Sequence, residues 1–178
     1  MIALKRILVP CDFSDTSAAA VRYGIAFARN FGARLYFLHV GDRAQSQFES
    51  EFPIGLDNAV EDAVRERLLR IVTPQEQLEL NPDFAIRPGA PAAEIVRYAQ
   101  DADIDLIVMG THGRGLVGHM VMGSVAEKVV RTAPCPVLTV RTPAQGWIAP
   151  EVATVSTRAS LVCIAPYVRR HRLVPRWH

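Results

Sequence analysis

The 178-residue sequence predicts an α/β fold built on a parallel sheet. Short apolar runs rich in β-branched residues alternate with segments in which apolar residues recur at helical spacing. This alternation is typical of a parallel sheet with helices on both faces. Because crossovers between parallel strands are right-handed, few topologies remain. We therefore expect a three-layer αβα fold. Its middle layer is a five-stranded, doubly wound, Rossmann-like sheet of order 3-2-1-4-5.

The first strand and helix have clear boundaries in the sequence. Residues 4–9 form an apolar strand that Pro10 ends. Ser14 is the predicted N-cap of a helix that continues to about Asn30, and Gly32 lies where a C-cap glycine is expected. The apolar residues expected to face the sheet from this helix are Ala18, Val21, Ile25 and Ala28.

The middle of the chain continues the alternation. Residues 34–40 are the second predicted strand, and the polar, irregular segment 41–55 is a predicted loop. Apolar residues on one face predict a helix over residues 56–72, and 75–80 are expected to form a further helical turn. A weaker third strand is predicted at residues 83–87.

The last part of the predicted domain contains two more helices and two more strands. Pro91 fits the first turn of a helix over residues 92–101. A buried strand follows at 104–109, and helical spacing resumes over 124–133. The fifth strand is predicted at 137–141.

A glycine-rich loop joins the fourth strand to the next helix. Its spacing is G-x2-G-x9-G-S, formed by Gly110, Gly113, Gly123 and Ser124. Glycines let the backbone approach a ligand closely, and successive N–H groups can form an anion-binding nest. A helix that starts at Ser124 adds unpaired N–H groups and the positive end of its dipole. The loop therefore predicts a phosphate site, with a flexible surface loop as the alternative.

Asp12 follows the first strand as the glycine loop follows the fourth. In the expected order these strands are neighbours, and ligands bind beyond strand ends where the winding reverses. Asp12 can accept a hydrogen bond from a ribose hydroxyl or an adenine amine, although a turn or helix-capping aspartate is an equal alternative. Val40 can offer its backbone to adenine, Ser124 can cap its helix or bind a phosphate oxygen, and Arg114 can add positive charge.

Other patterns argue against competing chemistries. The chain lacks GxxxxGK[ST], so it has no Walker P-loop. Residues 113–118 match GxGxxG, but a dinucleotide fingerprint opens its helix there and needs an acidic residue about 20 positions later, where this chain has Thr139-Val140-Arg141. We expect no metal site and no catalytic residue: His112 and His119 lack metal-ligand spacing, Cys11 and Cys135 lack a neighbouring base, and GxSxG is absent.

Charge and cysteine usage limit the partners and the compartment. The net charge is +2, and residues 142–178 contribute +4, which leaves −2 for residues 1–141. The body of the chain is therefore not a basic nucleic-acid module. The chain has three cysteines and no CxxC, which favours a reducing compartment. It also lacks an apolar run of signal-peptide or transmembrane character, so we expect a cytoplasmic protein without membrane or nucleic-acid partners.

Four segments resemble the universal stress protein family. They are ILVPCDFS at 7–14, LHV at 38–40, GAPAAEI at 89–95 and the stretch from Val108 to Val140. The resemblance covers about residues 1–141, our expected domain, and its glycine spacing is that of the family's ATP-binding form. It implies that ATP, with or without Mg²⁺, binds at Pro10, Asp12, Val40, Gly110, Gly113, Arg114, Gly115, Gly123, Ser124 and Val125.

The resemblance also implies an assembly and a role. Family members usually form homodimers through the last strand, here Val137–Arg141, and act as stress-response regulators with at most slow hydrolysis. Two alternatives stay open, a slow ATPase or nucleotidyl-transfer enzyme using the same crevice and a nucleotide-free interaction protein. Residues 142–178 lie outside the resemblance and form a basic extension, expected to be partly disordered or to pack on a partner subunit.

Overall fold

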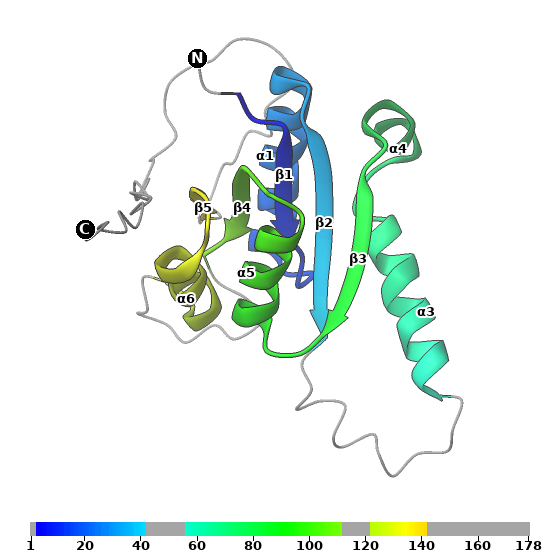
Figure 1. Ribbon diagram of the computed structural model, residues 1–178. Helices are drawn as coiled ribbons and strands as arrows, with labels where there is room; N and C mark the ends of the chain where they lie inside the picture. The colour runs from blue at the N-terminus through cyan, green and yellow to red at the C-terminus, as the bar shows by residue number, and fades with distance from the viewer. Residues whose placement is uncertain (1–2, 42–55, 112–121, 142–178) are drawn as a thin grey trace, which may run out of the picture.

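The computed structural model describes residues 3–41, 56–111 and 122–141. Within them, five parallel strands form one sheet of order β3-β2-β1-β4-β5, with helices on both faces (Figure 1). The predicted fold class and strand order are therefore confirmed. Most of the expected loop at 41–55 and the whole extension at 142–178 lie outside the described residues.

The elements follow the predicted sequence of strands and helices. The strands are β1 (Arg6–Pro10), β2 (Arg34–Gly41), β3 (Asp83–Pro88), β4 (Leu106–Gly110) and β5 (Val137–Val140). The helices are α1 (Asp15–Phe31), α3 (Leu56–Leu69), α4 (Pro74–Leu80), α5 (Pro91–Asp101) and α6 (Ser124–Thr132). The helix expected at 56–72 ends earlier, at Leu69, because Thr73 caps α4 as a separate helix.

Helix α1 is bounded as its sequence predicts. The Ser14 side chain accepts a hydrogen bond from the Ser17 N–H, and Gly32 ends the helix at φ 63°. Three of the four predicted inward residues, Val21, Ile25 and Ala28, are buried. The prediction for Ala18 is wrong: its side chain is exposed, because it lies at the margin of the buried arc in the first turn.

The alternation of side chains along the strands divides the core into two layers. Ile7 and Val9 pack on one face with α1 and the end of α3, and Leu8 packs on the other face with α5 and α6. Helix α1 lies very close to the sheet at Gly24, where a Cβ would be 2.5 Å from Val9 Cγ2. Leu68 of α3 is buried in the same layer as α1.

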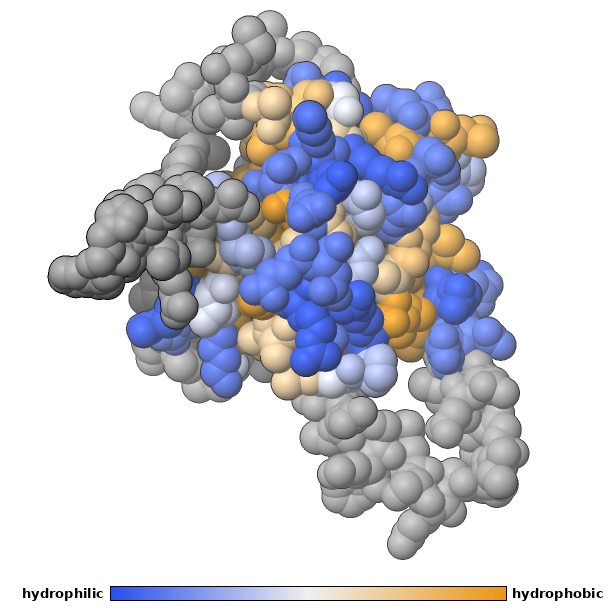
Figure 2. Space-filling model, in the orientation of Figure 1, coloured by the Kyte–Doolittle hydropathy of each residue, from blue (hydrophilic) through white to orange (hydrophobic). Residues whose placement is uncertain are grey.

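The surface is mostly hydrophilic on the face that carries α5. Figure 2 shows hydrophilic atoms across the middle of this face, with apolar atoms over α4 and between β3 and α3. Phe31, Leu69 and Leu78 are the exposed large hydrophobic residues among those described.

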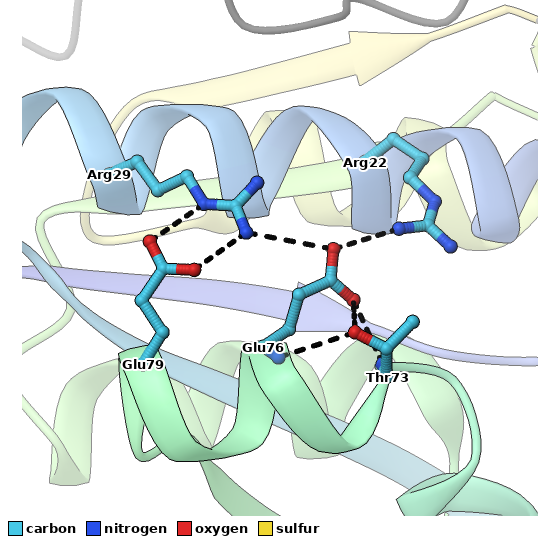
Figure 3. Close-up of polar contacts among 5 residues, drawn as sticks. All are labelled: Arg22, Arg29, Thr73, Glu76 and Glu79. Atoms are coloured by element: carbon cyan, nitrogen blue, oxygen red, sulfur yellow. Dashed lines mark hydrogen bonds and ion pairs between the residues drawn. The ribbon is translucent and has the colours of Figure 1, made fainter.

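An ion-pair network fastens α4 to α1 (Figure 3). Glu76 is only 8% exposed, and its Oε1 accepts from Arg22 at 3.0 Å and lies 3.9 Å from Arg29. Its Oε2 accepts from the Thr73 N–H at 2.8 Å and from the Thr73 hydroxyl at 3.0 Å, which completes a capping box. Arg29 also donates two hydrogen bonds to Glu79. The short helix α4 therefore depends on α1 for its position.

The ionisation of Glu76 is favoured by this network. Burial raises the pKa of the Glu76 carboxyl, but the hydrogen bonds from Thr73 and the charges of Arg22 and Arg29 outweigh burial and leave the pKa below its ordinary value. A lowered pKa in the folded state means that the charged carboxylate stabilises the native protein above the ordinary pKa, about 4.3. That contribution is lost as the pH falls through the folded pKa.

We expect Glu76→Gln to lower the free energy of unfolding by about 1–2 kcal/mol at pH 7, since the amide cannot pair with two partly exposed arginines. The difference from the wild type should shrink as the pH falls below the ordinary pKa of about 4.3 and then through the lowered pKa of the folded state, where the wild-type carboxylate takes up its proton. Urea unfolding at pH 7 and pH 3 measures both. Glu79→Gln removes a more exposed carboxylate of the same helix and should have a smaller effect. A Glu76→Gln deficit of equal size at the two pH values would contradict this assignment.

Candidate functional site

The carboxyl ends of β1 and β4 lie side by side at one edge of the sheet. The two strands pair in parallel, with Ile7 opposite Leu106 and Leu8 opposite Ile107. Asp12 follows the first of these strands, and Gly110 is the last residue of the second. The strand order reverses here, at the position where α/β sheets bind ligands. The two loops singled out in the sequence therefore open on the same edge.

Hydrogen bonds join the two ends of the glycine-rich loop. The N–H of Thr111, a buried residue, donates to the Val140 carbonyl oxygen at 2.9 Å. The Gly123 N–H donates to the Thr111 carbonyl oxygen at 2.7 Å. These bonds hold the start of α6 against the end of β4. The predicted site residues Gly113, Arg114 and Gly115 lie outside the described residues.

Helix α6 begins without a side-chain cap. Its N-cap is Gly123, whose φ of −70° and ψ of 152° are extended, and no side chain bonds to the first turn from that position. The N-cap side chains of α1 and α4, Ser14 and Thr73, do accept such bonds. The first N–H groups of α6 and its dipole therefore suit an anion.

Ser124 is not the cap that the sequence predicts. It is the first residue of α6, and its side chain is exposed, while Gly123 takes the extended cap conformation. In a Gly-Ser pair either residue can be the N-cap, and in the structure the N-cap is Gly123. Val125 follows in the first turn and is half-buried beside the core layer under α5 and α6.

Gly110 marks a close approach between β4 and α1. A Cβ at this position would lie 2.8–2.9 Å from three atoms of Thr16, in the first turn of α1. A side chain here would push helix and strand apart. The glycine is therefore needed for packing, whether or not a ligand also approaches its backbone.

The Asp12 side chain is folded back onto the start of α1. Its Oδ1 accepts hydrogen bonds from the Ser14 N–H at 3.1 Å and from the Ser14 hydroxyl at 2.6 Å. The Ser14 oxygen also accepts from the Ser17 N–H at 3.2 Å. This is the turn aspartate that the sequence left open as an alternative. The bonds give the half-buried carboxylate a fixed orientation at the site edge.

Pro10 and Val40 complete the described part of the predicted site. Pro10 is buried at the end of β1, opposite Leu38 of β2. Val40 lies near the end of β2 and is half-buried. Since parallel strands end at the same edge, both residues lie on the side of the sheet where Asp12 and Gly110 lie.

A cluster at this edge has no signal in the sequence pattern. Phe13 has a φ of 64°, which a bulky residue rarely adopts. Its ring centroid lies 4.7 Å from that of His39, and His39 Nδ1 lies 2.7 Å from the Cys11 carbonyl oxygen. The Arg67 guanidinium carbon lies 4.4 Å from the Phe13 ring centroid. Periodicity does not reveal a positive φ, and these contacts join residues far apart in the chain.

The described cysteines are poor nucleophiles. Burial raises the pKa of the Cys11 thiol far above its ordinary range, and the nearby Asp12 charge adds to the effect against a hydrogen bond with Ser17. Burial, with the Asp105 charge, raises the pKa of Cys135 to about 11. Both thiols are therefore protonated near neutral pH. Cys163 lies outside the described residues.

A hollow lies at the opposite edge of the sheet, between the ends of α1 and α4. Its volume is about 430 Å³, and Arg29 and Arg34 line it. Each arginine already pairs with a carboxylate, Glu79 and Asp83 respectively, so the hollow has less to offer an anion than the start of α6. Within the three described segments, no group of three His, Cys, Asp or Glu residues could hold a metal ion, and no helix could cross a membrane.

Comparison with known proteins gives a consistent family. A model described as the universal stress protein family matches residues 3–141. The universal stress protein MJ0531 of Methanocaldococcus jannaschii is 33% identical over 146 residues, which cover 78% of this chain and 83% of that protein. The solved structure of MJ0577, from the same organism, aligns with a TM-score of 0.70 at 30% identity and covers 81% of this chain and all of that one.

More distant structures share the fold. A universal stress protein in complex with cAMP has a TM-score of 0.52 at 24% identity, and it covers 78% of this chain and 98% of that one. A universal stress protein from Archaeoglobus fulgidus in complex with dAMP has a TM-score of 0.50 at 20% identity, with coverage of 79% and 99%. Nucleotide complexes therefore occur among the structural neighbours of this chain, and at these identities the likeness concerns the fold.

The packing at Gly110 leads to a stability prediction. Gly110→Ala should lower the free energy of unfolding by about 1–3 kcal/mol, because the new Cβ meets the Thr16 backbone and α1 cannot move without disturbing the core. Gly41→Ala is the matched control at the same edge, since a Cβ there would meet nothing within 4 Å. Urea unfolding of the two variants tests the difference. Equal stability would show that the contact with Thr16 is not restrictive.

Proposed function

This chain belongs to the universal stress protein family, and on that premise we propose that it binds ATP at the β1–β4 edge and acts as a cytoplasmic stress-response regulator. The observation that carries the proposal is the uncapped start of α6, held against the end of β4 beside the Asp12 turn. Unpaired N–H groups and the helix dipole favour a phosphate group at such a position.

The proposed site has two halves with different chemistry. Asp12 and the Val40 backbone bind the adenine and ribose, with Pro10 lining the pocket. The phosphates, with Mg²⁺ when it accompanies them, lie along the glycine loop. The residues proposed for this second half are Gly110, Gly113, Arg114, Gly115, Gly123, Ser124 and Val125.

The described residues favour binding over rapid turnover. The two described thiols are buried and protonated near neutral pH, which makes them poor nucleophiles. The Asp12 Oδ1 already accepts two hydrogen bonds, which suits orientation of a ligand better than abstraction of a proton. The cAMP and dAMP complexes of the distant relatives concern those proteins, so the support here comes from this chain's own residues.

We also propose a homodimer formed through Val137–Arg141. Strand β5 is the outermost strand of the described sheet and pairs with β4 on one side only. A terminal strand can pair with a copy of itself and so remove an open sheet edge. Analytical ultracentrifugation of the full chain measures this state directly.

Calorimetric titration with ATP tests the proposed site. We expect saturable binding by the wild type and at least a tenfold loss of affinity, or about 1.4 kcal/mol, in Gly123→Val. The φ and ψ of Gly123 lie in a region that residues with a Cβ commonly adopt, so we attribute the expected loss to obstruction of the first N–H groups of α6 by the new side chain.

Leu78→Ala changes a residue that is 87% exposed on α4 and is the control, which should bind ATP as the wild type does. Mass spectrometry of the denatured, purified protein identifies any nucleotide that stays bound through purification. A wild type that binds neither ATP, ADP nor AMP would overturn the proposed function and favour a nucleotide-free interaction protein.

A further inference from the structure

The turn that carries Asp12 contains an energetically unfavourable backbone conformation. Phe13, directly after Asp12, has a φ of 64°, and left-handed backbone costs a residue with a Cβ free energy. Ser14 on the other side is fixed as the N-cap of α1. The turn therefore cannot relax towards the helix and needs compensating contacts to keep this conformation.

Contacts of the Phe13 ring supply that compensation. The ring packs against the core layer under α1 and lies 4.7 Å from the His39 ring at 31°. His39 Nδ1 lies 2.7 Å from the carbonyl oxygen of Cys11, which precedes Asp12. The end of β2 therefore holds the turn from one direction, through both an aromatic and a polar contact.

Arg67 contacts the same ring from a third element, α3. Its guanidinium carbon lies 4.4 Å from the ring centroid, well within the range of a cation–π interaction. The next residue, Leu68, is 1% exposed and fixes the rotation of α3 on the core, so Arg67 is held towards the turn.

The other arginines near the end of α3 behave differently. Arg65 pairs with Glu61, and Arg70, just after the helix, pairs with Glu66, each four residues earlier on the surface. Arg67 has no carboxylate within 4 Å among the described residues and makes its contact with an aromatic face instead. Arg67 therefore differs from Arg65 and Arg70 in what its side chain contacts, an aromatic ring rather than a carboxylate.

We propose that Arg67 is a positioning residue of the nucleotide site: by stacking on Phe13 it holds the turn after β1 in the conformation that presents Asp12, and it thereby couples α3 to occupancy of the site. This inference rests on the proposed function. Without Arg67 the turn populates other conformations, and ATP must bind the fraction in which Asp12 is correctly placed. By reciprocity, bound ATP stabilises the contact and so the end of α3.

The first test compares Arg67→Gln with Arg65→Gln, which removes an exposed charge from the same helix, where Arg65 pairs with Glu61 and not with the turn. Arg67→Gln should weaken ATP binding about two- to fivefold, the range of a partly exposed cation–π contact, and Arg65→Gln should not. Arg67→Lys keeps the cation and should restore part of the affinity. Equal affinities of the two glutamine variants would overturn the inference.

The second test is hydrogen exchange, which a merely structural role for Arg67 would not move in the same way. ATP should slow amide exchange over residues 61–69 in the wild type and in Arg65→Gln, but not in Arg67→Gln. Unchanged exchange of this segment in ATP-saturated wild type would contradict the coupling.

Exchange without nucleotide separates this inference from the proposed function. In ATP-free protein, the peptide covering residues 11–16 should exchange at least twofold faster in Arg67→Gln than in Arg65→Gln. If the wild type binds no adenine nucleotide, the proposed function fails, while faster exchange in this peptide would still support the hold of Arg67 on the turn. Equal exchange of this peptide in the two variants would overturn that hold as well.

Discussion

The pairing of β1 with β4 is the interaction on which the candidate site depends. These strands are separated by about a hundred residues, yet Ile7 and Leu8 lie opposite Leu106 and Ile107. Their pairing brings the start of α1 and the start of α6 to one edge of the sheet. Two glycines allow α1 to lie close enough for this arrangement, since a Cβ at Gly24 would meet Val9 and one at Gly110 would meet Thr16. The arrangement of the two helix starts at this edge therefore depends on close helix–sheet packing as well as on strand order.

Helices α1 and α6, which begin beside the β1–β4 pair, begin in opposite ways. At α1 the Ser14 side chain satisfies an N–H of the first turn and orders the Asp12 carboxylate as well. At α6 the cap is Gly123, which leaves the first turn for an external acceptor. In the proposed site, the carboxylate beside the first helix start can accept hydrogen bonds, and the second helix start, which has no side-chain cap from Gly123, suits an anion. An elongated molecule with a neutral polar end and an anionic end matches that division.

The sequence predicted what depends on local pattern and failed where conformation depends on distant contacts. Apolar spacing located every described strand and helix to within about three residues, and the placement of Asp12 and Gly110 at one edge followed from strand order. The cap of α6 was wrong by one residue, because either member of a Gly-Ser pair can occupy that position. The packing need for Gly110 and the positive φ of Phe13 arise from atoms brought near by folding, which no window of sequence contains.

The turn at Asp12 and Phe13 and the start of α6 are held in place by different kinds of contact. The turn that carries Asp12 is contacted by the side chains of Ser14, His39 and Arg67, so the position of Asp12 depends on the packing of α1, β2 and α3. The start of α6 is held by two backbone hydrogen bonds through Thr111, which no side-chain substitution removes directly. In the site as proposed, changes in the surrounding helices should therefore alter recognition of the base and ribose more than binding of the phosphates. In the proposed site, recognition of the base and ribose and binding of the phosphates can therefore be adjusted separately, because different elements hold the two halves in place.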